Sequence, residues 1–258
     1  MQKLSAYILT YNEETKIEAA IKSVTWADEV VVVDSDSTDS TVSIAEGLGA
    51  HVVNVPFEGF GKLRKAAIES CSNEWIFSLD ADERCPHGAA SEILKILQAP
   101  DPADAYYIPR RNWFMGRWIR FSGWYPDYRQ PQLFRRGAII FREEDEVHEG
   151  YEVRGRVGYL KNPIWQLPFR NLEQLQVKAN RYSSLGSDKL MRKGVTGSMA
   201  KAFAHGLAAF FHTYIIRRGF MDGWAGFVIA LGNFEGTFYR YAKLTEKQSG
   251  WEQPPDGP

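Results

Sequence analysis

The sequence predicts an α/β fold: a mostly parallel sheet with helices on both faces, followed by a C-terminal helical extension. Three observations predict it. Short apolar runs rich in β-branched residues alternate with helical periodicities through the first hundred residues. The runs are largely continuous, as in parallel strands that are covered on both faces. Glycine and helix-capping residues separate them, and this repeated order of strand and helix favours a parallel sheet. The 258 residues suffice for one large domain or two small ones.

Four strands and four helices are expected in the first hundred residues. The strands are residues 4–10, 29–34, 50–55 and 75–80. The helices follow Asn12, which is a favourable N-cap, and cover 41–48, 62–70 and the stretch from Pro86 onward. Three strands end at Thr10, Asp34 and Asp80. Because the carboxyl ends of parallel strands meet at one edge, we expect these residues to share the edge at which open α/β sheets bind ligands.

The pattern changes near residue 100. We expect a strand at 105–109, a loop rich in aromatic residues and arginine from Arg110 to Tyr128, and a hairpin over 132–141 with Gly137 in its turn. A second acidic cluster covers 142–150, and a capping signature at Asn171 begins a long helix.

Two apolar helical segments with a local excess of positive charge lie between Thr196 and Leu244. They are interpreted either as core helices that close the domain or as an amphipathic pair on an anionic membrane face. The tail 246–258, with Pro254 and Pro255, is expected to be disordered.

Composition excludes several classes of function. The formal net charge of −1 gives no global attraction to nucleic acid. Two cysteines indicate a reducing compartment rather than a disulfide framework. Neither a signal peptide nor a spanning segment is expected, so we predict a cytoplasmic protein that can lie on a membrane. The sequence has no Gly-x-Gly-x-x-Gly or Walker A motif and no zinc-ligand spacing, which argues against dehydrogenases, P-loop enzymes and zinc sites.

The stretch Asp80-Ala81-Asp82-Glu83 is the strongest local signal for chemistry. Two acids spaced i, i+2 at the end of a strand can hold one hard divalent cation, directly or through water. The alternative is an acidic turn before a helix, with Asp82 or Glu83 near the helix N-terminus.

Three motifs together carry a family resemblance. They are "ILTYNEE" at 8–14, "VVVDSDSTDST" at 31–41 and "IFSLDADE" at 76–83. In this order and spacing the chain resembles the family-2 glycosyltransferases, which have the GT-A nucleotide-sugar fold. Four further motifs are similar to the lipopolysaccharide inner-core β-1,4-glucosyltransferase branch: "RRNWFMGRWIRFSGWYPD", "LFRRG", "VHEG" and "RRGFMDGWAGF". The chain departs from the family at Asp36, where glycine is usual; this acid either binds at the site or is solvated.

The resemblance implies an inverting, metal-dependent transfer of a hexose, glucose, from a UDP-sugar to a lipid-linked saccharide, the lipopolysaccharide core heptose. It implies a catalytic core over 1–165, with a nucleotide-sugar half 1–100 and an acceptor half 101–165, then a helical region 166–245 that can face the inner membrane on its cytoplasmic side. A transferase to polyprenyl phosphate and a catalytically silent nucleotide-sugar-binding module are the alternatives. A sugar nucleotidyltransferase is disfavoured, because its glycine-rich N-terminal loop is absent.

The resemblance also implies roles for single residues. The expected donor and acceptor residues are Thr10, Tyr11, Asn12, Glu13, Asp34, Asp36, Arg64, Asp80, Ala81, Trp124, Tyr125 and Asp127. Asp82 is expected to ligate Mg²⁺ or Mn²⁺. Arg64 and Lys62 are the candidates to pair with the diphosphate, and a solvated helix face is the alternative for both. Inversion needs one base for the acceptor hydroxyl; Glu149 is the first candidate, Asp145 the second, and His148 can orient the base. The alternative for the aromatic loop is a small satellite core.

Overall fold

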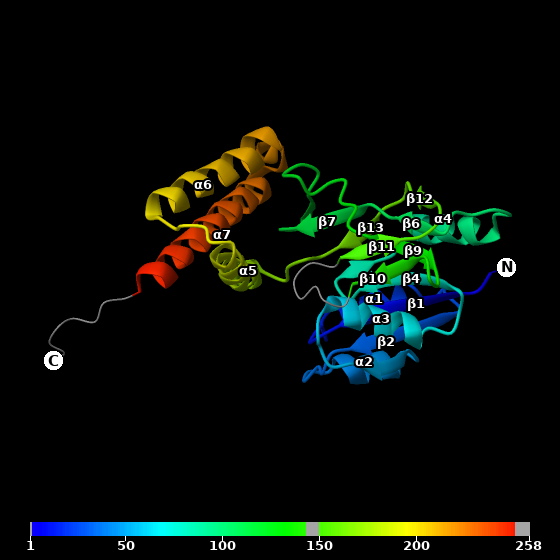
Figure 1. The fold of residues 1–258 in the computed structure, drawn as a ribbon. Helices are drawn as coiled ribbons and strands as arrows, with labels where there is room; N and C mark the ends of the chain where they lie inside the picture. Colours follow the sequence, from blue (N-terminus) through cyan, green and yellow to red (C-terminus); the bar gives the residue numbers. More distant parts are fainter. Residues whose placement is uncertain (1, 143–149, 251–258) are drawn as a thin grey trace. The chain divides into compact units, whose positions relative to one another are not determined.

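The computed structural model describes residues 2–142 and 150–250 (Figure 1). The chain divides into two compact units. The first consists of Met1–Arg111 and Pro126–Leu167, and the second of Asn112–Tyr125 and Pro168–Pro258. The aromatic stretch 112–125 therefore belongs with the C-terminal helices, although it interrupts the first unit in the sequence.

A seven-stranded sheet forms the centre of the first unit. Its order is β12 (Val157–Tyr159), β6 (Ala105–Tyr107), β9 (Pro131–Arg135), β4 (Trp75–Asp80), β1 (Leu4–Thr10), β2 (Glu29–Asp34) and β3 (His51–Asn54). Strands β4, β1, β2 and β3 run parallel, as do β12 and β6, whereas β9 is antiparallel to both neighbours. The expected mostly parallel sheet is confirmed.

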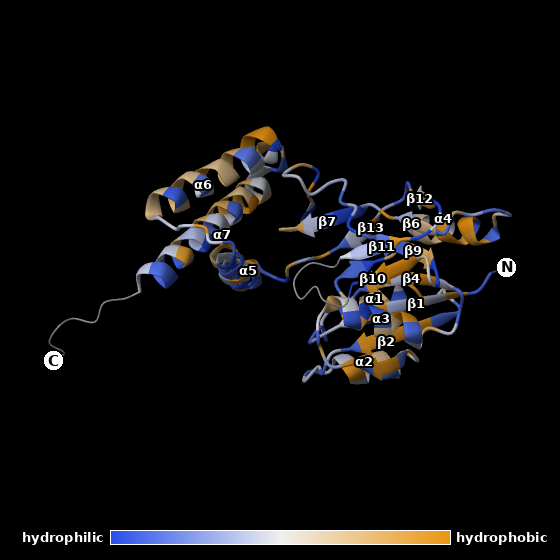
Figure 2. Cartoon of the chain, viewed as in Figure 1, coloured by the Kyte–Doolittle hydropathy of each residue, from blue (hydrophilic) through white to orange (hydrophobic). Residues whose placement is uncertain are grey.

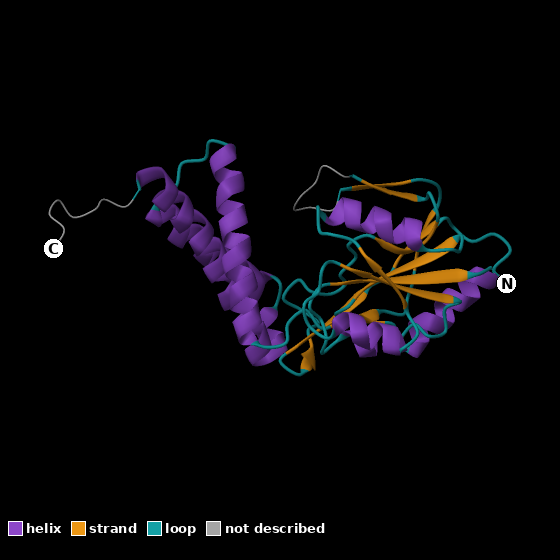
Figure 3. Cartoon of the chain, turned by 90° about the horizontal axis from the view of Figure 1, so that it is seen from below, coloured by secondary structure: helices purple, strands orange, loops and turns teal. Residues whose placement is uncertain are grey.

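Helices cover both faces of this sheet, as the strands and helices of the first unit show in Figure 3. They are α1 (Ile17–Lys22), α2 (Thr41–Gly47), α3 (Phe60–Ser70) and α4 (His87–Gln98). Strand β1 is buried throughout and alternates between two cores: Ile8 packs in the cluster that contains α1 and α4, and Leu9 in the cluster that contains α3. Burial on both faces explains why this strand is mostly apolar, with Leu4 and Ala6–Leu9 around the buried Ser5.

The register brings the three expected strand ends together. Thr10 lies opposite Asp34 across the β1–β2 pair, and Leu9 lies opposite Asp80 across the β1–β4 pair. The shared carboxyl edge is confirmed.

Three local predictions were wrong. Asn12 does not cap α1, which begins at Ile17; it adopts a left-handed φ of 52° instead. Residues 132–141 do turn at Gly137, but β9 joins the central sheet, whereas β10 (Ile139–Phe141) pairs with β11 (Tyr151–Val153). The loop expected after Arg110 contains a hairpin of β7 (Arg110–Phe114) and β8 (Arg117–Trp118). In the first two cases a distant partner decided the outcome, whereas the hairpin of β7 and β8 is a local pairing.

The second unit is mostly helical. It contains α5 (Leu172–Arg192), α6 (Met199–Phe211), the short π-helical turn η1 (His212–Ile216), the 3₁₀ turn η2 (Gly219–Asp222) and α7 (Gly223–Ser249). Asn171 caps α5 as expected, because its side chain accepts the N–H of Gln174 at 2.8 Å. Helix α7 continues through residues 246–249, the first part of the expected disordered tail; residues 251–258 lie outside the described residues.

Apolar residues run along α6 and the first half of α7 (Figure 2). A small core in this unit contains Phe114 and Ile119 from the aromatic stretch and Ala225 and Ile229 from α7. Among the described helices, none combines the length and the hydropathy needed to cross a membrane.

Candidate active site

The loops that follow β1 and β2 are tied together at the carboxyl edge. The Asn12 N–H donates to Ser37 Oγ at 2.8 Å, and Asn12 Oδ1 accepts the Thr38 N–H at 2.8 Å. The Glu13 N–H donates to Thr41 Oγ1 at 2.9 Å. Tyr11, between strand and loop, remains exposed. The left-handed conformation of Asn12 thus allows one loop to hydrogen-bond the other along its length, which gives a firm platform with an aromatic side chain on its surface.

Asp34, at the end of β2, is hydrogen-bonded to this platform. It is only 2% exposed, and it accepts hydrogen bonds from the Ser37 N–H at 2.8 Å and from Ser37 Oγ at 2.5 Å. Beside it, Thr10 Oγ1 and Ser35 Oγ are buried and find no hydrogen-bond partner within residues 2–142 and 150–250. Buried hydroxyl groups are rarely left without a partner, so this strand end is suited to a polar ligand.

Asp36 adopts a conformation that glycine adopts more easily. Its φ is 60°, in the left-handed region that aspartate tolerates better than most residues. Asn54 on β3 holds it: the Asn54 amide donates to Asp36 Oδ1 at 2.9 Å, and the Asp36 N–H donates back at 3.2 Å. The geometry explains why glycine suits this position, and it shows a structural contact for the extra acid.

Asp80 is held by a buried arginine from α3. Arg64 Nη2 lies 3.3 Å from Asp80 Oδ1, and Arg64 Nη1 lies 3.1 Å from Ser78 Oγ and 3.4 Å from the Tyr7 hydroxyl. Burial raises the pKa of that Tyr7 phenol, and the charge of Arg64 opposes the rise. The Asp80 side chain keeps 33% exposure, whereas Arg64 is buried. Arg64 is thus engaged with the acid rather than displayed at the surface.

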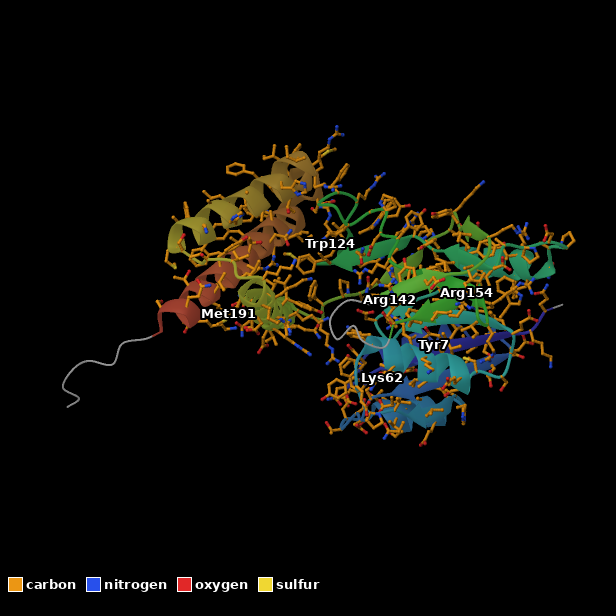
Figure 4. All side chains as sticks on the ribbon, viewed as in Figure 1. Tyr7, Lys62, Trp124, Arg142, Arg154 and Met191 are labelled. Carbon is orange, nitrogen blue, oxygen red and sulfur yellow. The ribbon has the colours of Figure 1, made fainter. Side chains whose placement is uncertain are left out.

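Lys62 differs from Arg64 although both lie on α3. It is exposed and pairs with Glu58 at 2.8 Å. Figure 4 labels Lys62 on this helix and Tyr7 on the adjacent strand β1.

The sequence did not predict the buried environment of Glu83. Glu83 lies in the short strand β5 (Glu83–Arg84), which pairs with β13 (Ile164–Gln166) and follows a turn at residues 81–82; helix α4 begins only at His87, so neither Asp82 nor Glu83 lies at a helix N-terminus as the alternative required. The side chain is fully buried and accepts the Asp80 N–H at 3.0 Å, Arg110 Nε at 2.5 Å and Gln132 Nε2 at 3.1 Å. Burial raises the pKa of the Glu83 carboxyl, and the charge of Arg110 opposes the rise. Glu83 therefore anchors the turn that carries Asp80.

Asp82 is half-buried in the turn between β4 and β5. Its main-chain oxygen accepts the Leu167 N–H at 2.8 Å, and its Oδ1 lies 3.5 Å from Gln166 Nε2. Arg84 fixes the same turn, because its guanidinium donates to the Ala81 carbonyl at 2.8 Å and to the Lys16 carbonyl at 2.8 Å. Burial lowers the pKa of Arg84, and the nearby Asp82 charge opposes this.

The donor set around Asp82 fits a magnesium-like ion. Across the described ranges, no three acidic, histidine or cysteine side chains are grouped as in a protein cage for a metal. Mg²⁺ does not need such a cage, because it keeps several waters and is commonly held by one or two carboxylates together with substrate phosphates. A single half-buried carboxylate at a strand end matches that manner of binding.

Comparison with known proteins identifies the family. The model described as "Glycosyl transferase family 2" matches residues 5–160. The chain belongs to this family.

Related glycosyltransferases match almost the whole chain. A Rickettsia bellii protein described as an uncharacterized glycosyltransferase is 34% identical over 260 residues, which cover 95% of this chain and 87% of that protein. The lipopolysaccharide core biosynthesis glycosyltransferase LpsC of Rhizobium meliloti is 29% identical over 258 residues, with 95% and 93% covered. The solved glucosyl-3-phosphoglycerate synthase of Mycobacterium tuberculosis overlaps 43% of this chain and 44% of its own at 27% identity, and its TM-score of 0.38 is too low to support an argument.

The remaining expected residues of this family-2 glycosyltransferase fall in different parts of the chain. Asp127 belongs to the first unit, where it pairs with Arg129 at 3.2 Å. Trp124, labelled in Figure 4, and Tyr125 belong to the second unit. There the Trp124 ring packs 5.9 Å from that of Phe114, so part of the aromatic stretch does form a satellite core. The candidates for the base, Asp145, His148 and Glu149, lie outside the described residues.

Proposed function

We propose that this family-2 glycosyltransferase moves glucose from UDP-glucose, with inversion, to a lipid-linked saccharide, a heptose of the lipopolysaccharide inner core. The observation that carries the proposal is the meeting of Thr10, Asp34 and Asp80 at the ends of adjacent parallel strands. The similarity to LpsC over the whole chain supports the class of acceptor.

The donor nucleoside would lie on the platform formed by the loops after β1 and β2. Tyr11 offers an exposed ring on which the uracil can stack. The buried hydroxyls of Thr10 and Ser35 and the carboxylate of Asp34 supply polar partners for the base or the ribose. Asn12 and Glu13 line the same site through the loop that they stabilise.

The diphosphate and its cation would lie beside Asp80-Ala81-Asp82. In this proposal Asp82 ligates Mg²⁺ or Mn²⁺, and Asp80 binds the ribose. A bound divalent cation neutralises the charge that grows on the UDP leaving group as the glycosidic bond breaks. Arg64 binds the side chain of Asp80, and Glu83 accepts its main-chain N–H, so Asp80 is already positioned before the donor binds.

Inversion requires a base on the side of the sugar opposite the leaving group. From their place in the "VHEG" motif, we assign this role to Glu149, with Asp145 as the second candidate and His148 as the residue that orients the base. The acceptor is assigned to the aromatic stretch around Trp124 and Tyr125 and to Asp127. Because such an acceptor carries a lipid, we infer that transfer takes place on the cytoplasmic face of the inner membrane.

The test is a donor screen followed by a single substitution. The purified chain is incubated with UDP-, GDP- and ADP-sugars and with Mg²⁺ or Mn²⁺, and nucleotide release and the anomeric configuration of the product are measured. We expect UDP-glucose to be preferred, chelation to stop turnover and the β-anomer to form. Asp82→Asn should lower turnover about 100- to 1,000-fold, as expected when a main electrostatic contact to the leaving group is lost.

Asp101→Asn is the matched control, because Asp101 is an exposed acid paired with Arg156 in the same unit. It should turn over like the unaltered chain. Full activity of Asp82→Asn with metal present would refute the metal assignment. Transfer to polyprenyl phosphate in place of a core saccharide would refute the proposed acceptor. Binding of UDP-glucose without turnover would show that the protein is a nucleotide-sugar-binding module and not an enzyme.

A further inference from the structure

Helix α6 packs with its small residues inward and its large apolar residues outward. Ala202 and Gly206 are buried, and a Cβ on Gly206 would lie 3.0 Å from the Phe234 ring of α7. The exposed ridge repeats every fourth residue, and it consists of Met199, Phe203, Leu207, Phe211 and Ile215. A helix that faces water has the opposite arrangement, and a contiguous exposed apolar patch marks an interaction surface.

The ridge continues into the turn between α6 and α7, which we call the apolar turn (residues 215–224). Its exposed apolar side chains are Ile215, Ile216, Phe220, Met221 and Trp224, of which Trp224 is 78% exposed. Lys201, Arg217 and Arg218 add positive charge. From Met199 to Phe234 the sequence contains one acidic residue, Asp222, and it is buried. The surface is thus apolar and cationic, which matches an anionic lipid surface better than a typical protein partner.

Asp222 connects the apolar turn to the aromatic stretch. Its carboxylate accepts the N–H groups of Arg120 and Phe121, each at 3.0 Å, and Ser122 Oγ at 2.9 Å. The Ser122 N–H donates to the Arg217 carbonyl at 3.0 Å. A buried carboxylate satisfied by three consecutive residues holds a loop firmly, because each donor would lose a charged partner if the loop moved away.

We propose that the apolar turn inserts into an anionic lipid surface and that Asp222 is a positioning residue, which holds the 120–122 segment at that surface. The aromatic stretch is thereby presented where a lipid-linked acceptor lies. The identity of that acceptor rests on the proposed function, whereas the lipid contact does not.

The lipid contact is tested by flotation of the full-length chain with phosphatidylcholine vesicles that contain or lack phosphatidylglycerol. The unaltered chain should float, and more so with phosphatidylglycerol. Phe220→Ser combined with Trp224→Ser should lower binding more than about tenfold, because two inserted aromatic side chains are lost. Arg217→Glu combined with Arg218→Glu should abolish the preference for phosphatidylglycerol.

Val177→Ser is the control, because Val177 on α5 is 63% exposed but lies outside the turn; it should bind as the unaltered chain does. Equal flotation of the Phe220/Trp224 variant, or none by the unaltered chain, would overturn the lipid contact. A concentration-dependent dimer that the same variant dissociates would assign the surface to a second copy instead.

The positioning role is tested with Asp222→Asn and with the milder Ser122→Ala, which removes one of the bonds. Both should float normally. Asp222→Asn should raise the KM for the lipid-linked acceptor about tenfold and leave the KM for UDP-glucose unchanged, and Ser122→Ala should raise the first KM less. An unchanged acceptor KM in both variants would refute the role. Normal flotation without any sugar transfer by the unaltered chain would refute the proposed function and leave the lipid contact standing.

Discussion

Replacing Glu83 with alanine should destabilise the first unit far more than its position in a two-residue strand suggests. Glu83 is fully buried and is the partner of Arg110, which is itself buried. Among the described residues, Arg110 Nη1 already has no hydrogen-bond partner. Without Glu83 the guanidinium would remain charged in the core with only the weaker interactions with Asp80 and Asp127, because arginine does not give up its proton.

The size of the effect follows from the burial of both partners. Removing one partner of a buried ion pair costs about 3–5 kcal/mol of unfolding free energy. In a domain of this size, each kcal/mol shifts the melting temperature by about 2–4 °C. Glu83→Ala should therefore melt about 6–20 °C below the unaltered chain.

A second variant separates stability from function. Glu83→Leu combined with Arg110→Met removes both charges and fills the space with apolar side chains, which commonly restores the stability that one removal loses. It should regain most of the melting temperature but not the turnover of UDP-glucose. The reason is that the Asp80 N–H loses its acceptor, so that the turn carrying Asp80 and Asp82 is no longer anchored.

Thermal unfolding followed by circular dichroism measures the first effect, and nucleotide release measures the second. Asp101→Ala is the control, because its pair with Arg156 is exposed and should leave the melting temperature unchanged. If Glu83→Ala melted like this control, the buried pair would not support the site. If the double variant recovered turnover as well as stability, Glu83 would be dispensable for positioning Asp80.

Three further predictions concern other parts of the chain. Asp36→Gly should change the unfolding free energy by less than about 1 kcal/mol in urea titrations, because relief of a left-handed aspartate offsets the lost bond to Asn54. Gly226→Ala should strongly lower the melting temperature of the chain, followed by the loss of helical circular dichroism, because the new Cβ would lie 1.8 Å from the Gly219 carbonyl oxygen. Gly236→Ala on the same helix is the control, because a Cβ there meets no atom within 4 Å, and it should leave the melting temperature unchanged. Glu92→Gln should weaken the loss of unfolding free energy that accompanies a fall in pH below 4.5. Burial raises the pKa of Glu92, but hydrogen bonds from the N–H groups of Lys161 and Asn162 outweigh it and lower the pKa below 4.5. A lowered folded-state pKa gives stability that is present above pH 4.5 and is lost as the pH falls through that lowered pKa, as acid unfolding would show.

The features that local sequence can encode were predicted well. Strands β1, β2 and β4 are short apolar runs because the sheet covers them on both faces, and that burial shows directly in composition. Once the strands are parallel, their carboxyl ends must meet, so the grouping of Thr10, Asp34 and Asp80 followed without any knowledge of packing.

The errors arose where a distant partner decided the local structure. Asn12 has the side chain of a helix cap, but its amide oxygen bonds Thr38 in another loop. Gly137 makes the predicted turn, yet the strand before it is taken up by the central sheet. For helix α6 the sequence left two alternatives open, a core helix or one of an amphipathic pair on a membrane, and the structure adds that alanine and glycine form its buried face while larger apolar residues remain exposed.

The acids at the carboxyl edge of the sheet differ in burial, and their spacing in the sequence could not reveal this difference. Glu83 is fully buried and satisfied by three donors, so it has little left to offer a ligand and acts on the main chain of Asp80. Asp80, three residues earlier, keeps a third of its side chain exposed although Arg64 holds it from below. An acid that binds a ligand must be both held in place and accessible; Asp80 meets both conditions, whereas Glu83 is held but not accessible. In the proposed site Asp80 contacts the donor, and Glu83 supports Asp80. A substitution at Glu83 should therefore impair donor binding although Glu83 itself makes no contact with the donor.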